Sequence, residues 1–146
     1  MIDRSLIILA LAALVVAATL TGRAWSRGRV AALVAGPSRS LWTALGESPD
    51  GRPSLIVFST PSCSACRTAQ YPAVEAVEAR FGGALRVVKV DLSQRPTIGH
   101  AFKVLTAPTT VVLRRDGRVG SFNHGFAPAD RLAAQVSAAA GPASPV

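Results

Sequence analysis

Cysteine and histidine are both scarce in this chain of 146 residues, which has two of each. Two cysteines are too few for a small scaffold held together by several disulfides. A structural zinc site needs about four ligands, and His100 and His124 are not spaced as a ligand pair with each other. We therefore expect no metal site.

Acidic and aromatic residues are also few. The chain has 8 Asp and Glu against 16 Lys and Arg, a formal net charge of +8, with two Trp, one Tyr and five Phe. A nucleic-acid-binding surface needs clustered basic residues with aromatic residues among them, and the sequence has no such cluster. The composition argues against a nucleic-acid partner, and the length suits one domain of ordinary size.

Charge is absent from residues 5–22, whose centre reads LIILALAALVVAATL. This length is close to the roughly 17 to 25 residues that cross a bilayer as a helix, and no good small-x-small cleavage site follows it. We therefore expect an uncleaved, single-pass anchor in the cell membrane, with a cleaved signal peptide as the alternative. Arg23, Arg27 and Arg29 follow the run, so the positive-inside rule favours a cytoplasmic C-terminal domain and leaves the extracytoplasmic side as the alternative.

The remaining sequence reads as one domain of alternating strands and helices. We expect strands over residues 54–59, 85–90, 110–114 and 118–122, and helices over 66–80, 95–103 and 128–139, with Pro72 kinking the first of these helices and a short helix ending at Leu45. This order predicts an α/β fold with a mixed central sheet flanked by helices.

Four segments follow from these expectations. They are a transmembrane anchor at 1–22, a basic linker with a short helix at 23–50, the α/β domain at 51–140 and a disordered tail at 141–146.

The two cysteines, Cys63 and Cys66, lie after a buried strand and at the start of a helix, in the sequence Cys-Ser-Ala-Cys. A thiolate attacks a disulfide and a thiol does not, so a redox cysteine needs a pKa lowered toward ambient pH. The amides and dipole at a helix start favour a negative sulfur at Cys63. Cys66, one turn later, is placed to resolve a mixed disulfide. The spacing predicts Cys63 as nucleophile and Cys66 as resolving thiol; the alternative, a purely structural disulfide, would gain little across so short a loop.

Four motifs, in order over residues 54–132, resemble those of the thioredoxin family. They are Val57-Phe58 before the cysteine motif, Val88-Lys89-Val90-Asp91, Ala107-Pro108-Thr109 and Arg115-Asp116-Gly117-Arg118. The resemblance implies a thioredoxin-like fold in which Pro108 is cis and lies against the cysteines. It also implies a substrate groove at Ala107, Pro108 and Ser62.

The sequence departs from the family pattern at several positions. Ser62 replaces a Trp, Ser-Ala replaces Gly-Pro between the cysteines, and Val57 and Val87 stand where a buried Asp and a Lys are usual. Pro72 comes one residue later than in the usual pattern.

The order of anchor, arginines and domain is similar to that of membrane-anchored thioredoxin-like proteins of bacteria. The resemblance implies a thiol–disulfide oxidoreductase that exchanges with protein substrates and a redox partner, without a cofactor. It leaves open whether the pair reduces or oxidises its substrates. The departures favour an alternative, a redox-inactive adaptor that binds a membrane or protein partner through the groove at Pro108.

Overall fold

The structure is a computed structural model that describes residues 8–22 and 38–141. The chain divides into two compact units, Met1–Ala32 and Leu33–Val146. Residues 23–37 of the basic linker expected over 23–50, and residues 142–146 of the tail expected over 141–146, lie outside the described residues.

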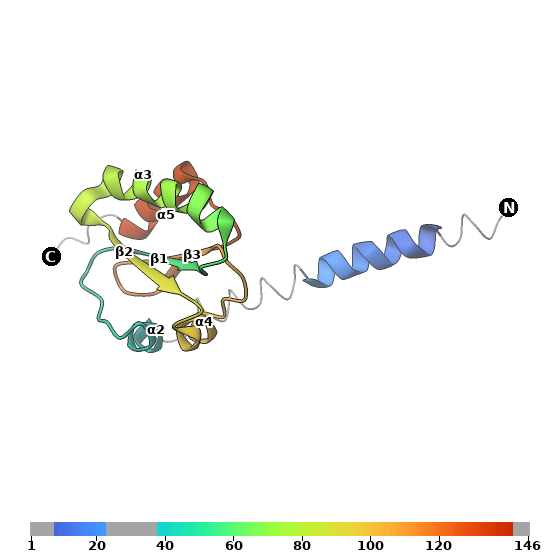
Figure 1. Cartoon of the computed structure of the whole chain (residues 1–146), viewed down its shortest axis with the longest axis horizontal. Helices are drawn as coiled ribbons and strands as arrows, with labels where there is room; N and C mark the ends of the chain where they lie inside the picture. The colour runs from blue at the N-terminus through green and yellow to red at the C-terminus, as the bar shows by residue number, and fades with distance from the viewer. Residues whose placement is uncertain (1–7, 23–37, 142–146) are drawn as a thin grey trace. The chain divides into compact units, whose positions relative to one another are not determined.

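One four-stranded sheet forms the centre of the second unit, with the strand order β2-β1-β3-β4 (Figure 1). β1 (Ser54–Ser59) pairs in parallel with β2 (Arg86–Asp91) and antiparallel with β3 (Thr109–Leu113), which pairs antiparallel with β4 (Val119–His124). All six residues of β1 are buried, as expected for a central strand covered on both faces.

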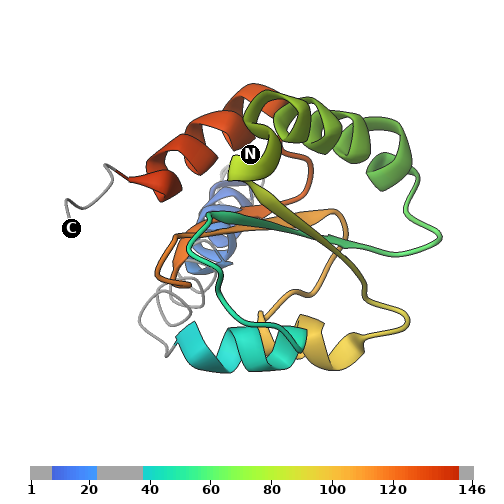
Figure 2. The same cartoon turned by 90° about the vertical axis from the view of Figure 1, so that its left-hand side faces the viewer.

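Helices cover both faces of this sheet (Figures 1 and 2). α3 (Tyr71–Phe81) and α5 (Ala129–Ala140) lie on one face, and α2 (Ser38–Leu45) and α4 (Pro96–Ala101) lie on the other. Alternate β1 residues enter two separate cores: Leu55 and Val57 pack toward α3 and α5, and Ile56 and Phe58 pack toward α2 and α4. The predicted mixed sheet flanked by helices is confirmed.

The helix α2 belongs to the core of this unit, although the sequence analysis assigns it to the linker. Leu41, Trp42 and Leu45 are 5%, 2% and 2% exposed and pack in the same core as Phe58. The core of this unit therefore includes residues before 51, since α2 contributes to it. A helix this short gives little periodicity in sequence, so its burial is decided by the sheet face that it covers.

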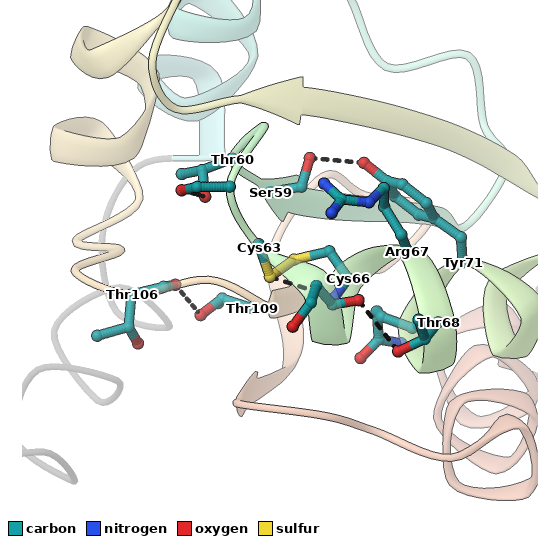
Figure 3. Close-up of a disulfide and its surroundings, with 12 residues drawn as sticks. Ser59, Thr60, Cys63, Cys66, Arg67, Thr68, Tyr71, Thr106 and Thr109 are labelled. Atoms are coloured by element: carbon teal, nitrogen blue, oxygen red, sulfur yellow. Dashed lines mark hydrogen bonds between the residues drawn. A yellow bond between two sulfur atoms is a disulfide. The ribbon is translucent and has the colours of Figure 1, made fainter.

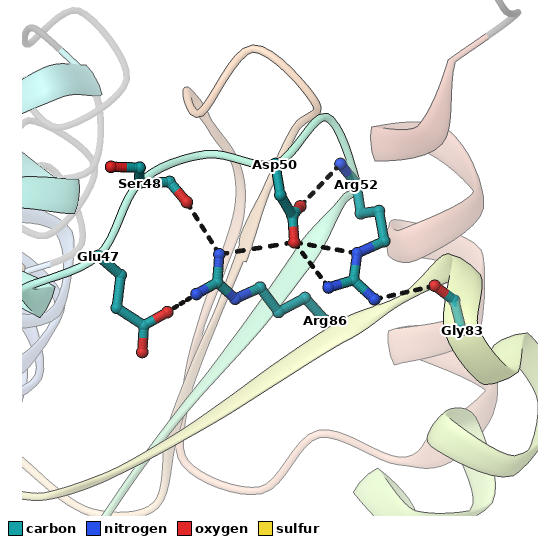
Figure 4. Close-up of polar contacts among 6 residues, drawn as sticks. All are labelled: Glu47, Ser48, Asp50, Arg52, Gly83 and Arg86. Carbon is teal, nitrogen blue, oxygen red and sulfur yellow. Dashed lines mark hydrogen bonds and ion pairs between the residues drawn. The ribbon is translucent and has the colours of Figure 1, made fainter.

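Polar contacts attach the α2–β1 connection to the start of β2 (Figure 4). Arg86, the first residue of β2, forms ion pairs with Glu47 and Asp50 and donates to the Ser48 carbonyl at 2.9 Å. Arg52 pairs with Asp50 at 2.6 Å and donates to the Gly83 carbonyl at 3.0 Å. These contacts hold the first residues of β1 and β2 next to each other.

A π-helical segment, η1 (Cys66–Gln70), interrupts the helix expected over residues 66–80. The Tyr71 N–H donates to the Cys66 carbonyl, five residues back instead of four. Pro72 follows immediately and has no N–H to donate to the preceding turn. The segment contains the extra residue that separates Pro72 from the cysteines when the sequence is compared with the thioredoxin pattern.

In the first unit, residues 8–22 form a helix. Its large apolar side chains are 55–67% exposed, Val16 being the least and Leu14 the most exposed. Among the described residues, no helix combines the length and apolar character needed to cross a membrane. The expected anchor begins within residues 1–7, outside the described part.

Candidate functional site

Cys63 and Cys66 form a disulfide just beyond the end of β1 (Figure 3). Their Cα atoms are 5.3 Å apart. The turn after β1 brings Cys63 to the helix start, and the Cys63 N–H donates to the Thr60 carbonyl at 3.1 Å. The structure therefore places both cysteines at the junction that the sequence predicts, between a buried strand and a helix.

The two sulfur atoms have different surroundings. Cys66 is 1% exposed, whereas Cys63 is partly exposed. The backbone N–H of Cys66 donates to Cys63 Sγ at 3.2 Å, so the Cys63 side chain occupies the position of a helix N-cap acceptor. A reagent or substrate can therefore approach Cys63, and a helix amide is directed at its sulfur.

The loop before β3 carries the second part of the site. The Ala107–Pro108 peptide bond is cis, as the family resemblance implies. Thr109, the next residue, is paired with Phe58 near the end of β1, which brings this loop to the same end of the sheet as the cysteines. Within the described chain, neither backbone group of Ala107 has a hydrogen-bond partner, so both are available to an incoming strand.

A cavity of about 290 Å³ lies beside this loop. It is bounded by the turn after β1, the β2–α4 connection, α4 and the loop before the cis bond. Leu105, on its rim, is 66% exposed, and His100 is also exposed. Its lining residues are Thr60, Leu92, Ser93, Pro96, Gly99, His100, Val104, Leu105, Thr106 and Ala107. The sequence analysis identified only Ala107 among them.

Asp91 ends β2 next to this cavity and keeps its charge readily. The Ser93 hydroxyl and backbone N–H both donate to Asp91 Oδ1, at 2.6 and 2.8 Å. These hydrogen bonds, the hydroxyl bond first, lower the pKa of Asp91 below its ordinary value of 3.8.

The face of the sheet beneath α3 has no carboxyl group at the position where the family has one. Val57 is 1% exposed and is paired with Lys89 on one side and Thr110 on the other. The buried polar groups on this face are amides and hydroxyls instead. Asn123 donates to Thr110 Oγ1 at 3.0 Å and exchanges two hydrogen bonds with Gln135.

Tyr71 provides another hydroxyl close to the cysteine helix. It donates to Ser59 Oγ at 2.8 Å, and Lys89 Nζ lies 5.2 Å from the centre of its ring. Arg67, which follows Cys66, donates to the Pro61 carbonyl and so holds the turn before Cys63. The sequence analysis gave no role to Tyr71, Ser59 or Arg67, because their contacts depend on the turn geometry.

Ser62 is exposed beside Cys63, and its hydroxyl is 3.5 Å from that of Thr60. The structure therefore brings together the five predicted site residues at one end of the sheet, with Ser62, Cys63 and Cys66 on one segment and Ala107 and Pro108 on another. Gln70, fully buried in the π-helical segment, was missed. The signal available in the sequence was Pro72, which comes one residue later than in the thioredoxin pattern and so indicates an extra residue in this helix.

A cysteine-pair disulfide at a helix start, beside a cis-proline loop on a mixed sheet, defines the class of thioredoxin-fold proteins. The thioredoxin family model matches residues 47–138, and the chain belongs to the thioredoxin family. This membership and the Cys63–Cys66 disulfide support thiol–disulfide oxidoreductase activity.

Curated relatives agree with this assignment. The thioredoxin of Bacillus subtilis is 31% identical over 78 residues, which is 53% of this chain and 73% of the relative. The thioredoxin of Porphyra purpurea is 30% identical over 67 residues, 46% of this chain and 62% of the relative. The chain thus spans less than two thirds of the Porphyra protein.

Solved structures confirm the thioredoxin-like fold. Chloroplastic thioredoxin z superposes with a TM-score of 0.56 at 22% identity, covering 62% of this chain and 80% of that one. Fasciola hepatica thioredoxin superposes with a TM-score of 0.53 at 26% identity, covering 60% and 81%.

Proposed function

We propose that this protein is a membrane-tethered thiol–disulfide oxidoreductase that acts on protein substrates through Cys63 and Cys66. The observation that carries the proposal is the asymmetry of the pair. Cys63 is partly exposed and accepts a helix N–H, while Cys66 is buried one turn away. That arrangement favours attack at Cys63 and resolution by Cys66.

In the reducing direction, the Cys63 thiolate attacks one sulfur of a substrate disulfide. A Cys63–substrate bond forms, the substrate disulfide breaks, and one substrate thiolate leaves. Cys66 then loses its proton, and its sulfur attacks Cys63 Sγ. The second substrate thiolate leaves, and the Cys63–Cys66 disulfide forms again. Two electrons pass to the substrate, and a dithiol donor must restore them; the oxidising direction reverses each step.

The loop at Ala107 would orient the substrate. An extended substrate segment can pair with the free backbone groups of Ala107, as an added strand pairs with a sheet edge. One of its side chains would then enter the adjacent cavity, whose apolar lining includes Leu92, Val104 and Leu105. This contact would select substrates that carry an apolar residue close to the reactive cysteine.

Exchange is tested by insulin reduction with dithiothreitol as electron donor. The full chain is assayed in detergent beside Cys63→Ser and Cys66→Ser. We expect Cys63→Ser to be inactive, and Cys66→Ser to accumulate a mixed disulfide that non-reducing gels detect. Equal activity in all three proteins would refute the proposal. Partner capture that survives loss of both thiols would instead support the adaptor.

The tether rests on the helix of residues 8–22. Its exposed apolar side chains, including Leu9, Leu14 and Leu20, have no polar face beside them, and the uncharged sequence continues toward residue 5. An arginine near the centre of a membrane span costs about 3 kcal/mol. We therefore expect Leu14→Arg to move the chain from the carbonate-resistant membrane fraction to the soluble fraction, with Leu105→Arg as the control. Unchanged fractionation of Leu14→Arg would count against the tether.

The orientation follows from the arginines after residue 22, which favour a cytoplasmic domain. A membrane-impermeant maleimide applied to intact cells, with and without prior reduction, tests this. No labelling of Cys63 until the cells are opened is the expected result. Labelling in intact cells after reduction would place the domain on the extracytoplasmic side.

A further inference from the structure

Gln70 is fully buried, 0% exposed, and binds a residue 57 positions away in the sequence. Its side-chain amide contacts both backbone groups of Ala127. Gln70 Nε2 donates to the Ala127 carbonyl at 3.1 Å, and the Ala127 N–H donates to Gln70 Oε1 at 2.9 Å. Ala127 is itself 0% exposed, so these two backbone groups depend on Gln70 for hydrogen bonds.

The segment that carries Ala127 also holds the cis-proline loop. Two residues before Ala127, the Gly125 N–H donates to the Pro108 carbonyl at 2.9 Å. Gly125 has a φ of +76°, a conformation that glycine adopts without steric cost. Between these two attachments lies Phe126, which is 48% exposed. An aromatic side chain is thus presented to solvent next to the loop before β3.

The π-helical segment explains why Gln70 reaches Ala127. Consecutive residues of an α-helix are about 100° apart around the axis, so one extra residue changes which side chains face the interior. The extra residue lies between Cys66 and Pro72, and Gln70 is the last residue of the segment. The segment begins at Cys66 itself, so a single widened turn joins the resolving cysteine to the residue that holds Ala127.

We propose that Gln70 is a positioning residue, which holds Phe126 beside cis-Pro108 so that its ring contacts the apolar part of a bound protein substrate. The inference rests on the proposed function. Leu105, 66% exposed on the cavity rim, and Phe126 are the large apolar side chains of residues 38–141 that are most exposed, and both lie on segments adjoining Pro108. The Gln70 side chain hydrogen-bonds to Ala127 and to neither sulfur, so it acts through the position of the Phe126 segment.

The test compares a protein disulfide with a small one in the full chain. Gln70→Leu removes both hydrogen bonds, and Gln135→Leu is the matched control because its amide pairs with Asn123 instead of the Phe126 segment. For Gln70→Leu we expect at least a fivefold rise in KM for insulin with kcat within twofold of the unmodified protein. The rate with hydroxyethyl disulfide, which is too small to span the groove, should stay within twofold. Gln135→Leu should leave KM for insulin within twofold.

A double-mutant cycle shows whether Gln70 acts through Phe126. Phe126→Ala should raise KM for insulin by a factor similar to that of Gln70→Leu. The KM of the double variant should be no higher than that of the more impaired single variant. Independent, multiplying effects would overturn the proposal. Equal losses on both disulfides, or an unchanged KM, would also overturn it, because these outcomes mark a purely structural role.

Hydrogen exchange of the unmodified chain gives a second measurement if Gln70→Leu fails to fold. We expect the Ala127 amide to exchange at least a hundredfold more slowly than the Phe126 amide. Equal exchange rates of the two amides would overturn the proposal that Gln70 holds the Ala127 backbone. Loss of the proposed function is distinguishable, because the unmodified protein would then reduce neither insulin nor hydroxyethyl disulfide while Ala127 stayed protected.

Discussion

At the scale of single residues, the site combines the accessible sulfur of Cys63 with the buried sulfur of Cys66. Cys66 is 1% exposed, and the residue that faces the sheet at the usual acid position, Val57, is equally buried. An acid there would take the proton of the resolving thiol in the family pattern. In this chain the hydroxyls of Thr110 and Tyr71 and the amide of Asn123 are among the polar groups of the same face. They donate and accept hydrogen bonds, but none of them is a carboxylate.

The exposures predict selective alkylation after reduction. In the folded, reduced chain, iodoacetamide should modify Cys63 at least about tenfold faster than Cys66, because the reagent must reach the sulfur. Quenched reactions followed by peptide mass spectrometry give both rates. In urea the two rates should converge. Equal rates in the folded chain would contradict the assigned asymmetry.

At the scale of elements, sequence patterns located the strands and the helices but not how each helix packs. β1 was predicted with its observed bounds, 54–59, because a run of buried apolar residues between turn signals has few alternatives. The helix α2 was assigned to the linker, since its contribution depends on the sheet face that it meets. The π-helical segment was not predicted, although the offset of Pro72 was visible. Gln70 was missed for the same reason: its partner, Ala127, is distant in sequence.

The assignment of α2 to the core predicts a large loss of stability for Trp42→Ala. Trp42 is 2% exposed, and Arg86 lies 5.3 Å from the centre of its ring. Truncating a buried aromatic side chain lowers the free energy of unfolding by about 3 to 5 kcal/mol. Urea unfolding of the full chain, followed by circular dichroism, measures this. Leu105→Ala, at a 66% exposed position, should change it by less than about 0.5 kcal/mol. A similarly small effect of Trp42→Ala would contradict the assignment of α2 to the core.

At the scale of the whole domain, the sheet has a reactive end and an anchored end. The disulfide and the cis-proline loop lie where β1 ends, and the contacts of Arg52 and Arg86 lie where it begins (Figures 3 and 4). The hydrogen bond from Arg52, the largest effect, lowers the pKa of Asp50 below its ordinary value of 3.8. A lowered carboxyl pKa contributes stability above the unfolded value, and this is lost as the pH falls through the folded pKa.

Asp50→Asn should therefore make the free energy of unfolding depend less on pH under acidic conditions. We expect the variant to be less stable than the unmodified chain at pH 6 by at most about 1 kcal/mol, because the side chain is 33% exposed. The difference should shrink toward zero as the pH falls below 3.8. Thermal unfolding at a series of pH values gives both curves. Asp116→Asn, on the exposed β3–β4 turn, is the control. A difference that stays constant down to pH 2 would contradict the role of this charge.

The hydrogen bond from the Cys66 amide to Cys63 Sγ also affects how strongly the pair holds electrons. In the disulfide the accepting sulfur is neutral, whereas after reduction the same sulfur can carry a full negative charge. Hydrogen bonds to an ionised acceptor are roughly twice as strong as those to a neutral one. Folding therefore stabilises the dithiol form more than the disulfide at this contact, and by thermodynamic linkage the folded chain accepts two electrons more readily than the unfolded chain does.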